Sequence, residues 1–197
     1  GATVRHLNVI PSQSLDTGMD PAGILVTASD VLVEGNVVEA MSGDASVDNT
    51  DPQPFALNGI QVFGNPTSND TVSEVTIKNN TVRDIDFSGD VAAGWPNYGG
   101  VAGMKIQAKV ENVDVIGNRV VGLHSAGWVF GVVTTTSSTD TSVVPQDITL
   151  RGNTLSELND GSVYDVFDAP NGVPFPGTGF GMEADATEAT IRANNLV

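Results

Sequence analysis

The octapeptide Val75-Thr-Ile-Lys-Asn-Asn-Thr-Val82 is one of six similar phrases in this chain. In each phrase the first, third and eighth residues are apolar, whereas the second and fourth are mostly polar. This alternation predicts a β-strand with one buried face, ending in a tight turn, because successive side chains of a strand point to opposite faces. The six phrases cover residues 2–9, 31–38, 75–82, 113–120, 148–155 and 189–196.

The spacing between phrases indicates a stack of similar coils. Successive phrases begin 29, 44, 38, 35 and 41 residues apart, so a constant unit is joined by loops of different lengths. A second alternating phrase begins with glycine and recurs at residues 23–26, 59–62, 103–106, 131–134 and 181–184. We expect each coil to have a first strand in the glycine phrase, a second in the octapeptide and a short third strand after it.

Asparagine occupies the sixth position of five of the six phrases, and Leu7 takes that place in the first. Strands of neighbouring coils lie about 4.8 Å apart, so asparagines in register can hydrogen-bond from coil to coil. The pattern predicts a ladder made of Asn36, Asn80, Asn118, Asn153 and Asn194.

This combination of strands and asparagines resembles the right-handed parallel β-helix of the pectate-lyase-like superfamily. The resemblance spans nearly the whole chain, 1–197, and implies an all-β solenoid of about five coils, with three strands per coil and an internal asparagine ladder. An antiparallel β-sandwich or barrel also shows alternation, but an asparagine at one fixed offset argues against it. The resemblance implies no single activity, because this solenoid carries lyases, hydrolases, epimerases, tailspikes and adhesins.

Length and composition suit one solenoid domain with a continuous core. Because the phrases begin and stop within a coil, we expect an excerpt of a longer protein, or a segment that packs end to end or forms homo-oligomers. The absence of cysteine excludes disulfides and thiol catalysis. No apolar run is long enough to span a bilayer, which argues against membrane insertion.

The net charge of −16, with only three lysines, argues against nucleic acid and anionic membranes as partners. A surface this acidic and lysine-poor is typical of proteins that stay soluble in high salt. We therefore expect a halophilic or marine source and an extracellular or cell-surface location, with an ordinary acidic secreted protein as the alternative.

Five segments, which we call the loop rim, contain every aromatic residue except Phe63, eleven aspartates, and no lysine or arginine. Long loops on a rigid scaffold often carry binding sites, and aromatic rings stack on the faces of sugars. We expect Trp95, Tyr98, Trp128 and Tyr164 to bind a glycan, whereas the phenylalanines more plausibly form small cores under the loops. The rim comprises residues 11–22, 42–58, 84–102, 124–130 and 159–180.

The sequence of one rim loop also suggests a cation-binding site. Asp44, Asp48 and Asp51 crowd a short stretch without a neutralising cation, and carboxylate oxygens suit Ca²⁺. Hydrated carboxylates of a halophilic surface are the alternative reading. No other cofactor is expected, and His6 and His124 are too many coils apart to share a metal.

Catalytic signals are sparse. Lys105, Glu183 and Asp185 form the only chemically interesting cluster expected on the outward face of the first strands, where a lysine can serve as a lyase base. A cross-coil contact or a solvated side chain is the alternative for Lys105. Asn49-Thr50-Asp51 matches one motif of polygalacturonase-like hydrolases, but the companion motifs are missing.

These observations favour a non-catalytic extracellular or cell-surface module that binds or displays a polysaccharide or other glycan. The main alternative is a polysaccharide lyase or glycoside hydrolase. A third is a structural segment of a tailspike, a fibre or a surface layer.

Overall fold

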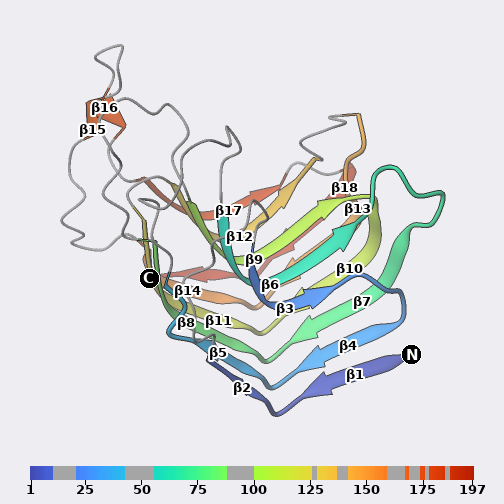
Figure 1. Ribbon diagram of the computed structural model, residues 1–197, viewed down its shortest axis with the longest axis horizontal. Coiled ribbons are helices and arrows are strands. Elements are labelled where there is room, and N and C mark those ends of the chain that lie inside the picture. Colours follow the sequence, from blue (N-terminus) through green and yellow to red (C-terminus); the bar gives the residue numbers. More distant parts are fainter. Residues whose placement is uncertain are drawn as a thin grey trace.

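The protein folds into stacked parallel β-sheets (Figure 1). The computed structural model describes residues 1–10, 21–42, 56–87, 100–125, 128–136, 142–158, 167–168, 174–175, 178–184 and 187–197. Within these residues there are strands and no helix, and the three large sheets are parallel throughout. The all-β, parallel architecture expected from the repeat is therefore confirmed, and its strand order is that of a β-solenoid.

Each sheet collects one strand from every coil. The first four residues of the octapeptides lie in sheet A: β1 (Ala2–Arg5), β4 (Val31–Glu34), β7 (Val72–Lys78), β10 (Val110–Ile116), β13 (Gln146–Arg151) and β18 (Thr187–Arg192). Sheet B contains β2 (Asn8–Val9), β5 (Val37–Glu39), β8 (Thr81–Phe87), β11 (Arg119–Ser125), β14 (Thr154–Leu158) and β19 (Asn195–Leu196). Sheet C contains β3 (Ala22–Val26), β6 (Ala56–Gly64), β9 (Gly100–Ala108), β12 (Trp128–Thr135) and β17 (Thr178–Ala184).

A short antiparallel pair stands apart from the three parallel sheets. It joins β15 (Phe167–Asp168) to β16 (Pro174–Phe175), with Phe167 opposite Phe175. These four residues belong to the segment between β14 and β17 that the sequence assigns to the loop rim.

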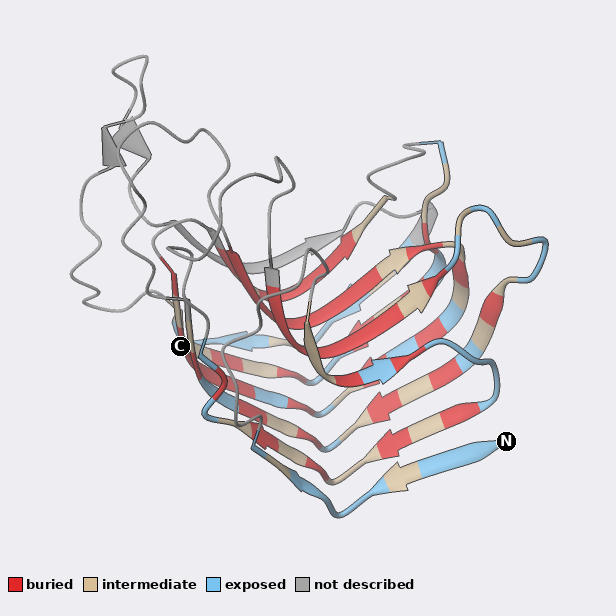
Figure 2. Cartoon of the chain, in the orientation of Figure 1, coloured by how far each residue is buried: buried red, intermediate tan, exposed pale blue. Residues whose placement is uncertain are grey.

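The register of the sheets follows the phrases. In sheet A the third residues of the octapeptides form one column, and in sheet C the residues after the leading glycines form another, including Val132 of the 131–134 phrase. Most of these side chains belong to the continuous buried core (Figure 2). The sheet A column comprises Val4, Val33, Ile77, Val115, Leu150 and Ile191, and the sheet C column comprises Ile24, Ile60, Met104, Val132 and Met182.

The turn from sheet A to sheet B has a left-handed residue at the fifth position of every phrase. The φ angle is 54° at His6, 55° at Asn79 and 49° at Ala193, and glycine fills the other three positions. Glycine adopts this conformation without strain, and asparagine more readily than most other residues. The sharp change of direction lets the next residue, at the sixth position, face into the coil stack.

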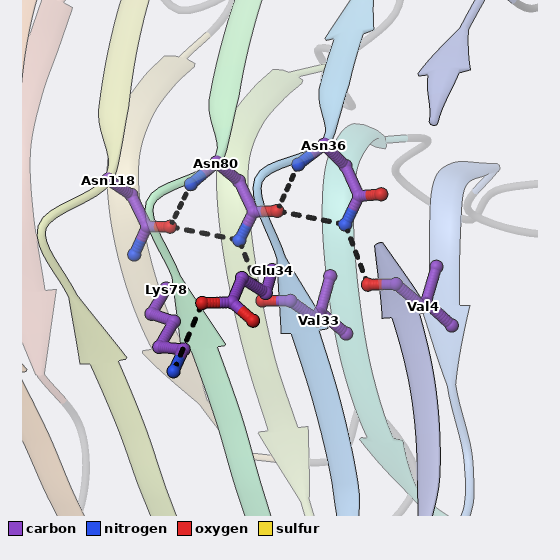
Figure 3. A network of polar contacts seen from close by, with 7 residues as sticks. All are labelled: Val4, Val33, Glu34, Asn36, Lys78, Asn80 and Asn118. Atoms are coloured by element: carbon purple, nitrogen blue, oxygen red, sulfur yellow. Dashed lines mark hydrogen bonds and ion pairs between the residues drawn. The ribbon is translucent and has the colours of Figure 1, made fainter. Parts of the chain in front are cut away.

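The asparagines at the sixth position are hydrogen-bonded from coil to coil (Figure 3). The backbone N and Nδ2 of Asn80 both donate to Oδ1 of Asn118, at 2.9 and 3.0 Å, and Nδ2 also donates to the carbonyl of Val33. The same pattern links Asn36 to Asn80 and Asn118 to Asn153. Each interior asparagine thus satisfies its buried amide without water, as buried polar groups require.

The leading glycines of sheet C allow the sheets to approach closely. A Cβ on Gly103 would lie 2.5 Å from Val120 Cγ1 and 2.6 Å from the carbonyl oxygen of Gly131. Gly59 stands in the same relation to Val82 and to the carbonyl of Gly103. No side chain fits there, which explains why glycine recurs at this position of the repeat.

Ion pairs join the outward faces of neighbouring coils. Glu34 lies in register between Arg5 and Lys78, and its carboxylate is 3.1 Å from Lys78 Nζ. Glu39 pairs with Arg83, whose Nε donates to Glu39 Oε2 at 2.6 Å. Both pairs are partly exposed, so the contribution of each to the free energy of unfolding is small.

Candidate functional site

Segments of the loop rim connect strands of sheet B to the next strands of sheet C. The segment 88–99 leaves β8 and returns in β9, and the segment 126–127 leaves β11 and returns in β12. The strands on both sides are in register, with Phe87 opposite Ser125 and Val101 opposite Val129. Two rim segments from adjacent coils therefore start side by side and end side by side.

Of the predicted glycan-binding aromatics, Trp95 and Tyr98 belong to segment 88–99, Trp128 directly follows segment 126–127, and Tyr164 belongs to the rim segment 159–180. Trp95, Tyr98 and Tyr164 lie outside the described residues, whereas the backbone of Trp128 begins β12, directly before Val129. Tyr98 precedes Val101, the register partner of Val129, by three residues in the sequence. The side chain of Trp128, like the cation candidates Asp44, Asp48 and Asp51, lies outside the described part of the chain.

Three polar residues lie in register where the rim segments leave sheet B. Asp86 of β8 is in register with His124 of β11 on one side and with Ser42 on the other. One carboxylate oxygen of Asp86, Oδ1, is buried and has no hydrogen-bond partner among the described residues. A carboxylate beside an imidazole offers acceptors and a donor of the kind that polyol hydroxyls need.

Sequence reasoning had not brought Ser42, Asp86 and His124 together. Their positions in the chain are separated by loops of different lengths, so only the strand register reveals the column. A usable signal was available in the octapeptides, because counting the same distance past the eighth residue of each phrase leads to all three.

Two of the three predicted catalytic candidates, Lys105 and Glu183, belong to strands of sheet C. Lys105 pairs with Val133, and Val133 pairs in turn with Glu183. The two candidates thus share a register position but are separated by one strand, a backbone distance of about 10 Å. The side chain of Glu183 and the whole of Asp185 lie outside the described residues.

Lys105 is not an open base on this face. Its exposed fraction is 7%, compared with 57% for Leu25 at the same register position near the N-terminal end of the sheet. The neighbours Gln61 and Val133 are also buried, at 4% and 5%. Lys105 is moreover engaged in an interaction within the protein, so a proton-abstracting role would require that interaction to be broken.

The next outward positions of sheet C remain partly accessible. Phe63, Gln107 and Thr135 form a half-buried column in register. Gln61 Nε2 donates to Gln107 Oε1 at 3.1 Å, and Gln107 Nε2 donates to the carbonyl of Thr136 at 3.4 Å.

One carboxyl group on sheet B has a pKa that its neighbours lower. On sheet B, a hydrogen bond from the Asn8 side chain and a second from Arg83 hold the pKa of Glu39 below its usual range.

The two histidines lie in different coils. His6 packs over Gly35 in the turn between β1 and β2, whereas His124 belongs to β11. No three histidine, aspartate or glutamate side chains within the described ranges gather closely enough to hold a metal ion.

Comparison of the chain with protein-family models, curated proteins and solved structures finds no match. The assignment to the β-solenoids therefore rests on the strand order, the register and the hydrogen bonds described above. The described part of the chain contains no helix with the length and apolar character needed to cross a bilayer.

Proposed function

We propose that this protein is a right-handed parallel β-helix of about five coils, of the pectate-lyase-like kind, that binds or displays a carbohydrate without catalysis of its own. Its place would be outside the cell or on the cell surface, in a halophilic or marine organism. The binding surface would be the loop rim, with Trp95, Tyr98, Trp128 and Tyr164 stacking on sugar rings.

The observation that carries this proposal is the segregation of residue types around the coil. Nearly all aromatics and eleven aspartates fall in the rim, which has no cationic side chain, whereas the described strands supply an aliphatic core and ion-paired outer faces. Adjacent rim segments leave sheet B at the register partners Asp86 and His124. Aromatic and hydrogen-bonding groups of two coils would therefore contact one sugar together. That combination of flat apolar faces and polar groups suits a sugar.

The test is a glycan array followed by affinity electrophoresis in gels containing the polysaccharides that score. We expect the intact chain to be retarded, and Trp95→Ala and Trp128→Ala each to weaken the affinity derived from the retardation about five- to thirtyfold, since an aromatic–sugar contact contributes on the order of 1–2 kcal/mol. Phe63→Ala, which removes the one aromatic outside the rim, is the matched control and should leave binding unchanged. Absence of binding to every glycan would refute the proposal.

The same rim offers a candidate binding site for a cation. Asp44, Asp48 and Asp51 would supply hard oxygen ligands for Ca²⁺, which could order the loop or bridge to sugar hydroxyls. Isothermal titration of the chain with CaCl₂ should show saturable heat that Asp48→Asn and Asp51→Asn together abolish. Equal weak heats for both proteins would mean nonspecific attraction to an acidic surface.

A polysaccharide lyase or hydrolase is the second candidate, because Lys105 and Glu183 share a register position on sheet C. In that case Lys105 would be the base, with Glu183 and Asp185 beside it, and acidic polysaccharides would yield unsaturated or reducing ends. Activity that persists in a Lys105→Ala, Glu183→Ala double variant would exclude this site. The burial of Lys105 is the reason for ranking this candidate second.

A further inference from the structure

The chain contains two tripeptides of the form Asn-x-Thr, the acceptor signal for N-linked glycosylation, in which x is any residue except proline. They are Asn69-Asp70-Thr71 and Asn79-Asn80-Thr81. Asn65-Pro66-Thr67 has a similar form, but its proline excludes it. The motif alone does not distinguish the first two tripeptides, whereas the structure places them in very different surroundings.

Asn69 lies in the turn that joins β6 to β7 (Figure 1). Within this turn the backbone N of Thr67 donates to Asn65 Oδ1 at 3.0 Å. Lys109, from the neighbouring coil, anchors the turn from outside, since its Nζ donates to the carbonyl of Ser68 at 2.7 Å. The turn therefore has a fixed shape that does not depend on the side chain of Asn69.

The side chain of Asn69 is available for reaction. Asn69 and the following Asp70 are both exposed, and the carboxamide of Asn69 forms no hydrogen bond with a described residue. Thr71, which completes the signal, is half-buried. Its contact with Ser29 Oγ, at 3.3 Å, engages the backbone carbonyl and leaves the hydroxyl unoccupied. An enzyme can reach this tripeptide in the folded protein.

The second signal is built into the turn between sheets A and B. Its middle residue, Asn80, is 1% exposed and belongs to the asparagine ladder. The backbone N of Asn79 donates to the carbonyl of Ile116 at 3.1 Å, and that of Thr81 donates to the carbonyl of Asn36 at 2.8 Å. Although Asn79 is exposed, an enzyme that binds three consecutive residues can reach this signal only after these bonds between coils break.

The turn that contains Asn69 is also separate from the loop rim. It connects sheet C to sheet A, whereas the rim segments connect sheet B to sheet C (Figure 1). A sugar chain on Asn69 would therefore start at a different corner of the coil and leave the proposed binding surface uncovered.

We propose that Asn69 is a site of N-linked glycosylation and that Asn79 in the folded chain is not. In the reaction, Nδ2 of Asn69 bonds to the anomeric carbon of an oligosaccharide carried on a polyprenyl diphosphate. The bond from that carbon to the diphosphate oxygen breaks, the diphosphate leaves with the bonding electrons, and one Nδ2 proton passes to a base of the transferring enzyme. This inference rests on the extracellular location in the proposed function, because N-linked sugars are added to exported chains.

The test offers the purified, folded chain to a purified single-subunit oligosaccharyltransferase together with a lipid-linked oligosaccharide. Trypsin separates the two signals, because cleavage after Lys78 leaves Asn69 in the peptide 6–78 and Asn79 in the peptide 79–83. Mass spectrometry should find the sugar on Asn69, with an occupancy at least about tenfold higher than on Asn79, since modification of Asn79 requires local opening of the coil stack.

Two variants assign the sugar to its signal. Thr71→Ala removes the hydroxyl that completes the first signal and keeps the carbonyl that accepts from Ser29, so it should abolish the modification of a chain that stays folded. Thr81→Val, the matched change in the second signal, should leave the occupancy of Asn69 unchanged.

Unfolded peptides separate the effect of the fold from that of the local sequence. Synthetic peptides of residues 65–73 and 75–83 should both be modified, because neither can form a coil without neighbouring coils. Comparable occupancy of Asn69 and Asn79 in the folded chain would overturn the proposal, as would an unmodified Asn69 in either the chain or its peptide. These outcomes contradict this inference alone, whereas absence of glycan binding on the array contradicts the proposed function alone.

Discussion

At the scale of single residues, the asparagines at the sixth position connect the coils most strongly. Asn80 is buried and combines four roles: its backbone N and Nδ2 donate to Asn118, Nδ2 donates to Val33, and Oδ1 accepts from Asn36. Asn80→Leu has similar volume but leaves several of these groups without partners, so we expect it to lower the free energy of unfolding by about 2–4 kcal/mol. Urea unfolding measures this loss. Asn194→Leu, at a half-buried position with fewer of these bonds, should cost less than half as much.

Thr134 is a residue whose replacement should stabilise the protein. It is buried in sheet C beside Ile106, and its hydroxyl has no hydrogen-bond partner among the described residues. Thr134→Val removes a buried polar group without changing the volume, so we expect the free energy of unfolding to rise by about 1 kcal/mol. Thr135→Val, at the half-buried neighbouring position, is the matched control and should change little. A lower melting temperature for Thr134→Val would contradict this reading.

Glu39 should make stability depend on pH in a predictable direction. Hydrogen bonds from Asn8 and Arg83 lower its pKa in the folded protein, so the folded state binds the Glu39 proton less readily than the unfolded chain. The stabilisation is present above the unfolded pKa of about 4.3 and is lost as the pH falls through the folded value. The stability difference between the natural chain and Glu39→Gln should therefore shrink in acid. A difference that grows below pH 4.5 would contradict the assignment.

At the scale of elements, glycine has two separate uses that substitution should distinguish. Gly103 lies where sheets B and C approach, and a Cβ there would clash with the Gly131 backbone. Gly152 has a φ of 64°, but the nearest atom to its virtual Cβ is 3.9 Å away. We expect Gly103→Ala to cost at least about 3 kcal/mol, as overpacking with backbone movement does, and Gly152→Ala about 1 kcal/mol from backbone strain alone. Thermal melts of the two variants in the opposite order would reject this explanation.

The elements also show what the sequence could and could not reveal. Apolar positions at fixed offsets within the phrases predicted the three sheets and their register, because in a solenoid identical offsets become spatial neighbours. The left-handed bends at Ala40 and Glu157 were not predicted, since these residue types carry no turn signal. Burial of Gln61 and Lys105 was missed for another reason: outward alternation on a strand says nothing of what covers that face.

At the scale of the whole molecule, the described coil stack is the scaffold that carries the rim segments. The coil stack combines an aliphatic core with amide and ionic contacts between neighbouring coils, so each coil depends mainly on the next. Rim segments of different lengths are added at one corner without disturbing the register on either side. This division lets the rim vary while the scaffold stays constant, as the proposed binding function requires.

The most direct test of the account is the intrinsic fluorescence of the chain during titration with a glycan selected on the array. The chain has only two tryptophans, Trp95 and Trp128, and both belong to the proposed binding rim. We predict a saturable change in emission intensity and wavelength that is reduced by either single Trp→Phe replacement and retained in Lys105→Ala. Emission that stays unchanged while the glycan demonstrably binds would place the site elsewhere and contradict the account.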